Sequence, residues 1–329
     1  MEKYNFAMKE KMLVKIERDR LKNELQPKKD STLPAMEKKT NMTQRSDKTK
    51  FTPFQTETTN PFLAKPMDPF NYKNTVLSKT QKGHSMAVCS VAIHPKKPII
   101  GTGSDDMFWK IWTVNQSELI MSGEGHKDWV SSLKFHPKGL HIVTASGDST
   151  VKIWDFVNTS CTFTFKDHKQ PVWSIDLNES GDYIATGSMD NSCRLLDINV
   201  GKCRTALRGH VDSVNGVHFK PYSTMLATCS ADKTVSLWDV RTGLCVQTFY
   251  GHNSSVNGCK FAPRGDKLAT CDSQGIVKSW DVNMGKELNS YDCEHFSANA
   301  VSIDRSGTFI AVGCDGGLIH LFNDSMGER

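Results

Sequence analysis

The chain has 329 residues, 38% of them hydrophobic, which is enough for one large core or two modest domains. Residues 1–15 are charged throughout, so they do not form a signal peptide, and no apolar run is long enough to cross a membrane. Residues 1–82 carry 18 Lys and Arg against 10 Asp and Glu, and the remainder carries 23 against 26. Such a basic tail could meet an acidic partner, including nucleic acid, but we expect only a tail solvated by its charges.

The ten cysteines all lie between Cys89 and Cys314, and no two of them have C-x-x-C spacing. Without a signal for export, we expect a cytoplasmic protein whose thiols stay reduced. They would then act as small hydrophobic side chains and hold neither disulfides nor a metal.

Residues 1–26 are predicted to form one amphipathic helix, because Met8, Met12 and Ile16 recur every four residues among charged ones. The helix is too short for a stable coiled coil of its own, so we interpret it as the end of a longer coil through which the protein could self-associate. Pro27 ends it.

Residues 27–74 show no periodicity and are rich in Thr, Lys, Asn and Pro, which predicts a flexible basic linker. Phenylalanines stand among these prolines at Phe51, Phe54, Phe62 and Phe70. They could be docking points, although isolated aromatic residues in such a stretch usually have no specific role.

From Gly83 the sequence repeats with a period of 42 residues. Histidine recurs at His84, His126, His168, His210 and His252. Tryptophan or a substitute recurs at Trp112, Trp154, Leu196, Trp238, Trp280 and Phe322. This period, with short alternating runs such as residues 151–154, predicts four-stranded units. The pairs Gly125-His126 and Trp154-Asp155 make the units resemble WD40 repeats, and the resemblance implies an all-β propeller over residues 75–324 with a tail at 325–329.

In such a blade the His, Thr, Asp and Trp of one unit are spaced to meet. The expected network comprises His84, Thr102, Asp106, Trp112, His126, Thr144, Asp148, Trp154, His210, Thr228, Asp232 and Trp238. A buried Asp needs its lone pairs filled, and the His ring and turn amides can fill them. Because the set recurs in every unit, we interpret it as structural. No separate catalytic arrangement, phosphate loop or cofactor site stands out, so we expect a non-enzymatic protein that takes no small-molecule substrate.

Four units deviate from the pattern, and the first of them, unit one, ends in Trp112-Thr113 instead of Trp-Asp. Unit three has Leu196 in place of Trp, and unit five has Gln274 where the Asp should stand, with Asp272 two residues early. Unit six has Val312 for the Thr and Gly316 for the Asp. We therefore expect units five and six to be the loosest part of the ring.

Six units are visible in the sequence, whereas most propellers of this class have seven. Residues 75–78 could supply an outer strand that pairs with the last unit and closes a six-bladed ring. We favour the alternative of a truncated seven-bladed ring.

A candidate partner-binding rim follows from the alternation along the inner strands, because the neighbours of the core valines face the central channel. These rim residues are Trp129, Trp173, Asn215, Asn257, Asp105 and Met189. Two tryptophans on adjacent blades resemble a binding hot spot. The alternative is that each indole only packs against its own blade.

Several segments are also similar to a family of WD-repeat proteins of the ciliary central apparatus. They are residues 9–13, 17–19, 104–112, 123–129, 212–215, 228–234 and 262–265. The resemblance implies a structural protein of the cilium or flagellum axoneme, with central-apparatus and microtubule-associated proteins as partners. The competing hypothesis is a substrate receptor of a cullin-type ubiquitin ligase, because Trp238-Asp239-Val240-Arg241 fits the W-D-x-R signature, with Arg241 as the adaptor contact.

Overall fold

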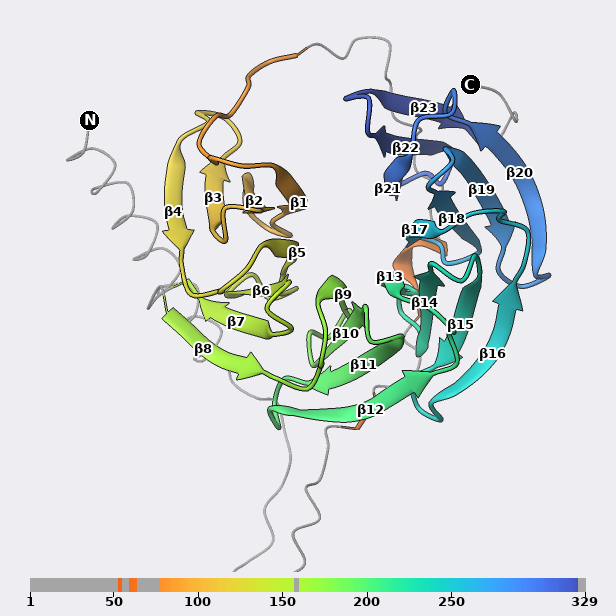
Figure 1. Cartoon of the computed structure of the whole chain (residues 1–329), viewed down its shortest axis with the longest axis horizontal. Helices are drawn as coiled ribbons and strands as arrows, with labels where there is room; N and C mark the ends of the chain where they lie inside the picture. Colours follow the sequence, from red (N-terminus) through yellow and green to blue (C-terminus); the bar gives the residue numbers. More distant parts are fainter. Residues whose placement is uncertain (1–52, 55–58, 64–76, 157–159, 325–329) are drawn as a thin grey trace, which may run out of the picture.

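The computed structural model describes residues 53–54, 59–63, 77–156 and 160–324. Within these residues the chain forms 23 β-strands and one short 3-10 helix, η1 (Pro61–Leu63). The strands make six antiparallel sheets set around a common axis as the blades of a propeller (Figure 1). The predicted all-β propeller is therefore confirmed. No helix in the described part of the chain is long and apolar enough to cross a membrane.

Each blade is built from consecutive strands. Blade one comprises β1 (Val88–Ile93), β2 (Ile99–Ser104), β3 (Trp109–Thr113) and β4 (Leu119–Gly123). Blade two comprises β5 (Val130–Phe135), β6 (His141–Ser146), β7 (Val151–Asp155) and β8 (Ser160–Phe165). Blade three comprises β9 (Val172–Leu177), β10 (Tyr183–Ser188), β11 (Ser192–Asp197) and β12 (Lys202–Arg208).

The other three blades follow the same order. Blade four comprises β13 (Val214–Phe219), β14 (Met225–Ser230), β15 (Val235–Asp239) and β16 (Leu244–Phe249). Blade five comprises β17 (Val256–Phe261), β18 (Lys267–Asp272), β19 (Ile276–Asp281) and β20 (Lys286–Asp292). Blade six has three strands, β21 (Ala298–Ile303), β22 (Phe309–Cys314) and β23 (Ile319–Asn323).

Two faces of the disc can be distinguished by their loops. The upper face carries the loop that leads into each inner strand, such as residues 124–129, and the turn between the second and third strands, such as 105–108. The lower face carries the turn between the first and second strands, such as 94–98, and the turn between the third and fourth, such as 114–118.

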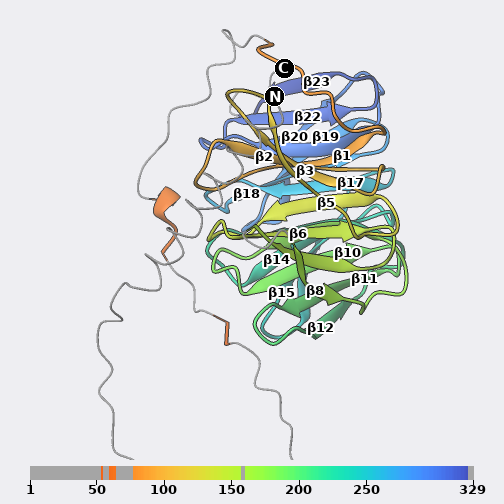
Figure 2. The ribbon, with the colours of Figure 1, turned by 90° about the vertical axis from the view of Figure 1, so that its left-hand side faces the viewer.

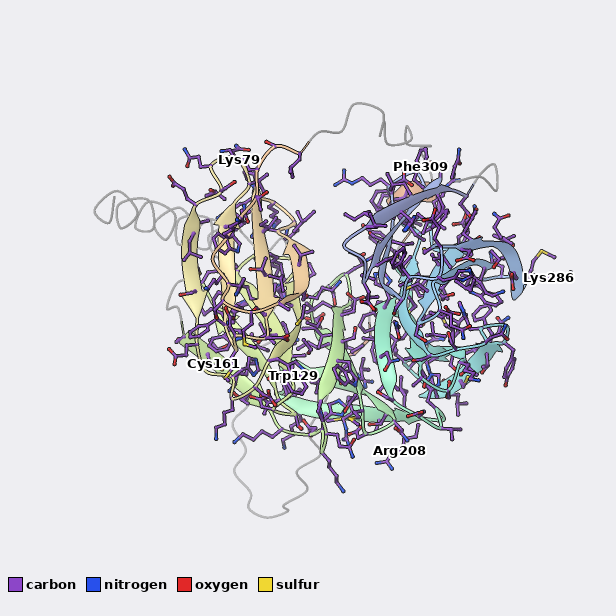
Figure 3. All side chains as sticks on the ribbon, turned by 45° about the horizontal axis from the view of Figure 1, so that its top comes forward. Lys79, Trp129, Cys161, Arg208, Lys286 and Phe309 are labelled. Carbon is purple, nitrogen blue, oxygen red and sulfur yellow. The ribbon has the colours of Figure 1, made fainter. Side chains whose placement is uncertain are left out.

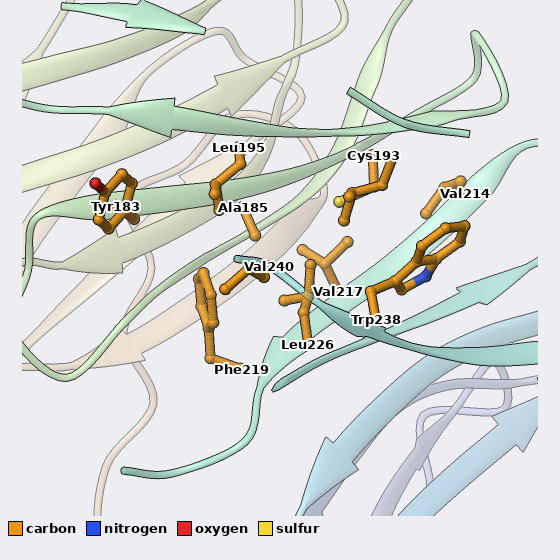
Figure 4. Packing of buried hydrophobic residues seen from close by; sticks show 11 residues of the cluster. Tyr183, Ala185, Cys193, Leu195, Val214, Val217, Phe219, Leu226, Trp238 and Val240 are labelled. Carbon is orange, nitrogen blue, oxygen red and sulfur yellow. The ribbon is translucent and has the colours of Figure 1, made fainter. Parts of the chain in front are cut away.

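The hydrophobic core lies between neighbouring blades. In the cluster between blades three and four, Tyr183 and Leu195 face Phe219, Leu226 and Trp238, all nearly inaccessible to solvent (Figure 4). Similar clusters join each of the other successive pairs. Because every blade interior is shared with its neighbour, the blades stabilise one another by burial of apolar surface.

No such cluster joins blade one to blade six among the described residues. Val88, Val91 and Ile93 in β1 are 53%, 66% and 78% exposed, whereas the corresponding Val130 and Leu133 in β5 are fully buried. Figure 1 shows β1 and β21 on the two sides of the break in the ring. In the described part of the chain no fourth strand pairs with β23, and the proposed closing strand is wrong for Leu77 and Ser78, which are not in a strand. Thr75 and Val76 lie outside the described residues.

Two pieces of the predicted linker contact the lower face of the propeller. The Phe54 ring stacks on Tyr183 at a centroid distance of 4.5 Å, and the guanidinium of Arg204 lies 4.1 Å from the Phe54 ring centre. Asn60 Nδ2 donates to the Pro263 carbonyl over 2.8 Å. Figure 2 shows these pieces on one side of the disc. The contact of Phe54 fits the alternative that phenylalanines of this stretch are docking points, and the predicted helix over 1–26 lies outside the described residues.

The open boundary at β1 can be tested with one substitution at equivalent strand positions. Val217 occupies in β13 the position of Val91 in β1, but it is 5% exposed rather than 66%. Val217→Ala should lower the free energy of unfolding by about 2 kcal/mol. Val91→Ala should cost less than about 0.5 kcal/mol, because little apolar surface is lost. Urea unfolding measures both costs, and equal costs would mean that the β1 face is covered in solution.

Candidate functional site

The predicted His, Thr, Asp and Trp side chains of blade two form one hydrogen-bonded chain. His126 Nδ1 lies 3.0 Å from Asp148 Oδ2, and His126 Nε2 lies 2.7 Å from Thr144 Oγ1. The Trp154 indole N–H donates to the same hydroxyl over 2.8 Å. Equivalent contacts of 2.7–2.8 Å join His84, Thr102, Asp106 and Trp112 in blade one and His210, Thr228, Asp232 and Trp238 in blade four. The network ties the leading loop, the second strand, the following turn and the third strand of a blade together.

The aspartate of this network is held in its charged form. Burial alone would raise the pKa of Asp148, but hydrogen bonds from His126, the Lys127 amide and the Thr150 hydroxyl outweigh burial and keep that pKa well below its ordinary value. The pKa of the corresponding aspartate is lowered for the same reasons in the other complete blades, at Asp106, Asp190, Asp232 and Asp272. These groups are saturated by contacts within the blade, which is the behaviour of a structural unit.

Blade five keeps the network although Gln274 stands at the usual position of the aspartate. Asp272, at the end of β18, takes the role of the missing aspartate, with its Oδ2 2.9 Å from His252 Nδ1. Its Oδ1 accepts the amide of Ile276 at 2.9 Å. Thr270 completes the chain at 2.7 Å from His252 Nε2 and 2.8 Å from Trp280 Nε1. An aspartate two residues early in sequence therefore reaches the same histidine.

The glycine before each histidine is required by the tryptophan. A Cβ on Gly209 would lie 2.9 Å from the Trp238 ring, and one on Gly125 would lie 3.0 Å from Trp154. In blade three the position of the glycine is taken by Asp167 and that of the tryptophan by Leu196. We infer that the smaller leucine leaves the room that a side chain at position 167 needs, so that the two departures from the repeat are coupled. His168 keeps its bonds to Asp190 and Thr186.

A β-bulge near the start of each inner strand explains where the rim residues point. The strand register shifts between Val130 and Ser132 in β5, which leaves Ser131 as the extra residue, and the same shift recurs in every blade. The extra residues of blades three to five are Trp173, Asn215 and Asn257. Such bulges turn a side chain out of the regular alternation, a feature that strict alternation did not predict.

Trp129 and Trp173 form a stacked pair at this rim. Their ring centroids are 6.2 Å apart with an angle of 24° between the planes. Trp173 is 37% exposed, and Met189, whose amide donates to the Pro171 carbonyl, is 48% exposed. The Trp129 ring also lies against Gly147, where a Cβ would come within 2.5 Å of it. Figure 3 shows Trp129 well inward of the peripheral Cys161. Each indole therefore contacts its own or a neighbouring blade and still offers a surface.

The remaining predicted rim residues are engaged within the chain. Asn215 Nδ2 donates to the Val256 carbonyl and Asn257 Nδ2 to the Ala298 carbonyl, both over 3.0 Å. Asp105 accepts the Cys89 thiol over 2.8 Å, and burial together with this contact raises the pKa of Cys89 to about 12. These bonds join neighbouring blades or elements of one blade, which favours a structural role over contact with a partner.

Arg241 lies on the lower face, in the turn after β15. Its side chain is 60% exposed, and the guanidinium Nη2 lies 3.3 Å from Asp239 Oδ2. The Arg241 amide donates to Asp239 Oδ1 over 3.0 Å. The arginine of the W-D-x-R signature thus stabilises its own turn.

Comparison with known proteins agrees with this class of structure. The family described as WD domain, G-beta repeat matches residues 75–113, 117–155, 159–197, 201–239 and 243–281, together more than half of the chain. The chain therefore belongs to the WD40 family of propeller scaffolds for protein interaction. From the second on, each matched segment spans the outer strand of one blade and the inner three strands of the next.

A curated relative gives a narrower likeness. The chain is 52% identical over 48 residues to the flagellar WD repeat-containing protein Pf20 of Chlamydomonas reinhardtii. The aligned stretch is 15% of this chain and 8% of that relative.

The coupling between Asp167 and Leu196 predicts a double-mutant result. Leu196→Trp alone should destabilise the protein by about 1–3 kcal/mol, because the indole would overlap Asp167. Adding Asp167→Gly should recover at least about 1 kcal/mol, since it restores the pairing found in blades one, two, four and five. Urea unfolding of the four proteins gives the coupling energy, and strictly additive costs would contradict the explanation.

The lowered aspartate pKa values predict acid lability. Because the folded pKa lies below the unfolded value of about 3.9, the unfolded state binds more protons as the pH falls. The contribution of these aspartates to the free energy of unfolding should be nearly constant above about pH 5 and fall steadily below about pH 4. Burial also lowers the pKa of His94, His136 and His218, so a separate, shallower decline should begin near the unfolded histidine pKa of about 6.5. Asp148→Asn should reduce the steeper slope at low pH, while the exposed control Asp212→Asn should leave it unchanged. Urea titrations at several pH values measure the slope, and equal slopes in the two variants would contradict the assignment.

Proposed function

We propose that this propeller is a scaffold of the flagellar or ciliary axoneme, and that it binds a protein of the central apparatus through the upper rim around Trp129 and Trp173. The stacked tryptophan pair is the observation that carries the binding part of this proposal. The likeness to flagellar Pf20 supports the axonemal setting. Under this proposal the protein holds partners in place and transforms no substrate.

The pair has the chemistry of a binding hot spot. Trp173 offers a large apolar ring that is 37% exposed, and Met189, in a turn of the same upper face, adds a flexible apolar side chain that is 48% exposed. Stacking against Trp129 holds the Trp173 ring in one orientation, so a partner pays little entropy to order it. Tryptophan anchors of this kind contribute about 2 kcal/mol or more to binding when a partner covers them.

Among the described residues, the two pieces that precede the propeller contact its lower face and leave the upper face uncovered. Phe54 contacts blade three, and Asn60 contacts the first turn of blade five, both on the lower face. The described part of the segment that precedes the propeller thus covers the side of the disc away from the tryptophans. A partner at the upper rim would not compete with it.

The ubiquitin-ligase alternative stays a prediction that rests on Arg241. The ion pair between Arg241 and Asp239 supports a local structural role for this arginine. An adaptor would also have to dock on the lower face, which Phe54 and Asn60 already contact. We therefore favour the axonemal scaffold.

The proposal is tested by tagging the full chain in a flagellated or multiciliated cell and measuring how much stays with the axoneme after detergent extraction. The wild-type protein should be retained. Trp173→Ala should reduce retention strongly, because loss of about 2 kcal/mol weakens binding roughly 30-fold. Because Trp129 also packs against Gly147, Trp129→Ala could unfold the protein. Its retention is therefore compared with the wild type only after its thermal unfolding midpoint has been measured.

Tyr250→Ala is the matched control, since Tyr250 is an aromatic residue that is 75% exposed outside the tryptophan pair. It should be retained like the wild type. Equal retention of Trp173→Ala and wild type would overturn the rim while leaving the axonemal setting. A wild-type protein that washes out completely would overturn the axonemal setting itself.

A further inference from the structure

Blade six carries a cluster of two thiols and an imidazole that the other blades lack. Ligand atoms of Cys293, Cys314 and His320 all lie within 4.8 Å of one another. Cys293 is fully buried and His320 is 5% exposed, while Cys314 is partly buried. The residues are 21 and 6 positions apart in the chain, so no short spacing marked them in the sequence.

The cluster stands where the other blades have their hydrogen-bonded network. Cys293 occupies the position of the glycine before the histidine, in the loop that leads into β21. Cys314 ends the second strand, β22, and His320 lies on the third strand, β23. The same three segments are joined in blade two by His126, Thr144 and Trp154.

Blade six has lost the residues that would form that network. Val312 replaces the threonine, Gly316 the aspartate and Phe322 the tryptophan. Phenylalanine is smaller than tryptophan, which leaves room for a side chain at position 293, as Leu196 does for Asp167 in blade three. The cysteines and the histidine thus appear together at the one blade where the usual tie between these segments is missing.

We propose that Cys293, Cys314 and His320 bind a thiophilic metal ion, with zinc as the expected occupant. Two thiolates and one imidazole are the donor set that zinc takes, and soft sulfur ligands disfavour calcium and magnesium. Tetrahedral zinc with bonds of about 2.0–2.3 Å keeps its ligand atoms roughly 3.3–3.8 Å apart. Because all the ligand atoms lie within 4.8 Å of one another, the cluster needs to contract by at most about 1.5 Å to reach that geometry.

In blade six the metal would link the loop before β21 to β22 and β23, as the hydrogen-bonded network links the equivalent segments in the other blades. Binding displaces the two thiol protons and changes no oxidation state, so the step needs no oxidant or reductant. Three protein ligands leave a fourth position for water or for a group from another segment or a partner. Because the folded arrangement brings the ligands together, zinc should stabilise the blade next to the break in the ring.

The experiment uses the full chain, purified with a reductant and without chelators, after removal of any tag. Zinc content by mass spectrometry should be close to one ion per chain. Cobalt substitution should give thiolate-to-cobalt charge-transfer absorption, which reports sulfur ligands directly. Competition with a chromogenic chelator should show that Cys314→Ser weakens zinc binding by about 100-fold or more.

His320→Gln is the second variant, and it should lose zinc while keeping both thiols. Cys245→Ser is the matched control, because Cys245 is an exposed cysteine in β16, outside the cluster. It should keep the metal. Adding zinc should raise the thermal midpoint of the wild type and of Cys245→Ser, and leave that of Cys314→Ser unchanged.

Two results would overturn the proposal. The first is a wild-type protein that holds no zinc, or variants Cys314→Ser and His320→Gln that hold as much zinc as the wild type. The second is a disulfide between Cys293 and Cys314 that forms in protein purified without reductant and that persists after zinc is added. A disulfide is recognised by an intact mass lower by two hydrogens and by the loss of two titratable thiols.

Discussion

A buried threonine hydroxyl is the meeting point on which five of the six blades depend. In blade two it lies between the His126 ring and the Trp154 indole, and His126 in turn is bonded to the charged Asp148. A buried carboxylate is tolerated only when its lone pairs are filled, so the loop, the turn and two strands must adopt one geometry. The same contacts recur every 42 residues, so these blades present their cores to their neighbours in the same way.

The surface follows from the same construction. The bulge at the start of each inner strand places one side chain at the channel rim, and blades three to five put Trp173, Asn215 and Asn257 there. The asparagines join neighbouring blades through backbone carbonyls. At the same position, Trp173 stacks on Trp129. One repeated position therefore serves as an internal joint in some blades and as an accessible surface in another.

Most of the fold could be predicted because the repeat is a local pattern with a physical cause. The network partners were predictable from their spacing, since each set lies within about 30 residues and in a fixed order. The features that sequence reasoning missed are contacts between residues whose spacing in the chain does not follow the repeat. The position of Asp272 was judged from its place in the chain, although a turn brings its carboxylate to His252. The cluster at Cys293, Cys314 and His320 has no short spacing, and the contact of Phe54 with Tyr183 joins residues far apart in the chain.

The attachment of Phe54 and Asn60 to the lower face has a mechanical consequence. A partner that contacts Phe54 itself would lie below the disc, whereas a partner at Trp173 would lie above it. The two would be separated by the length of a six-residue strand, about 20 Å, through a stiff stack of sheets. The propeller would then act as a spacer of fixed thickness, which transmits load between two assemblies and keeps their distance constant.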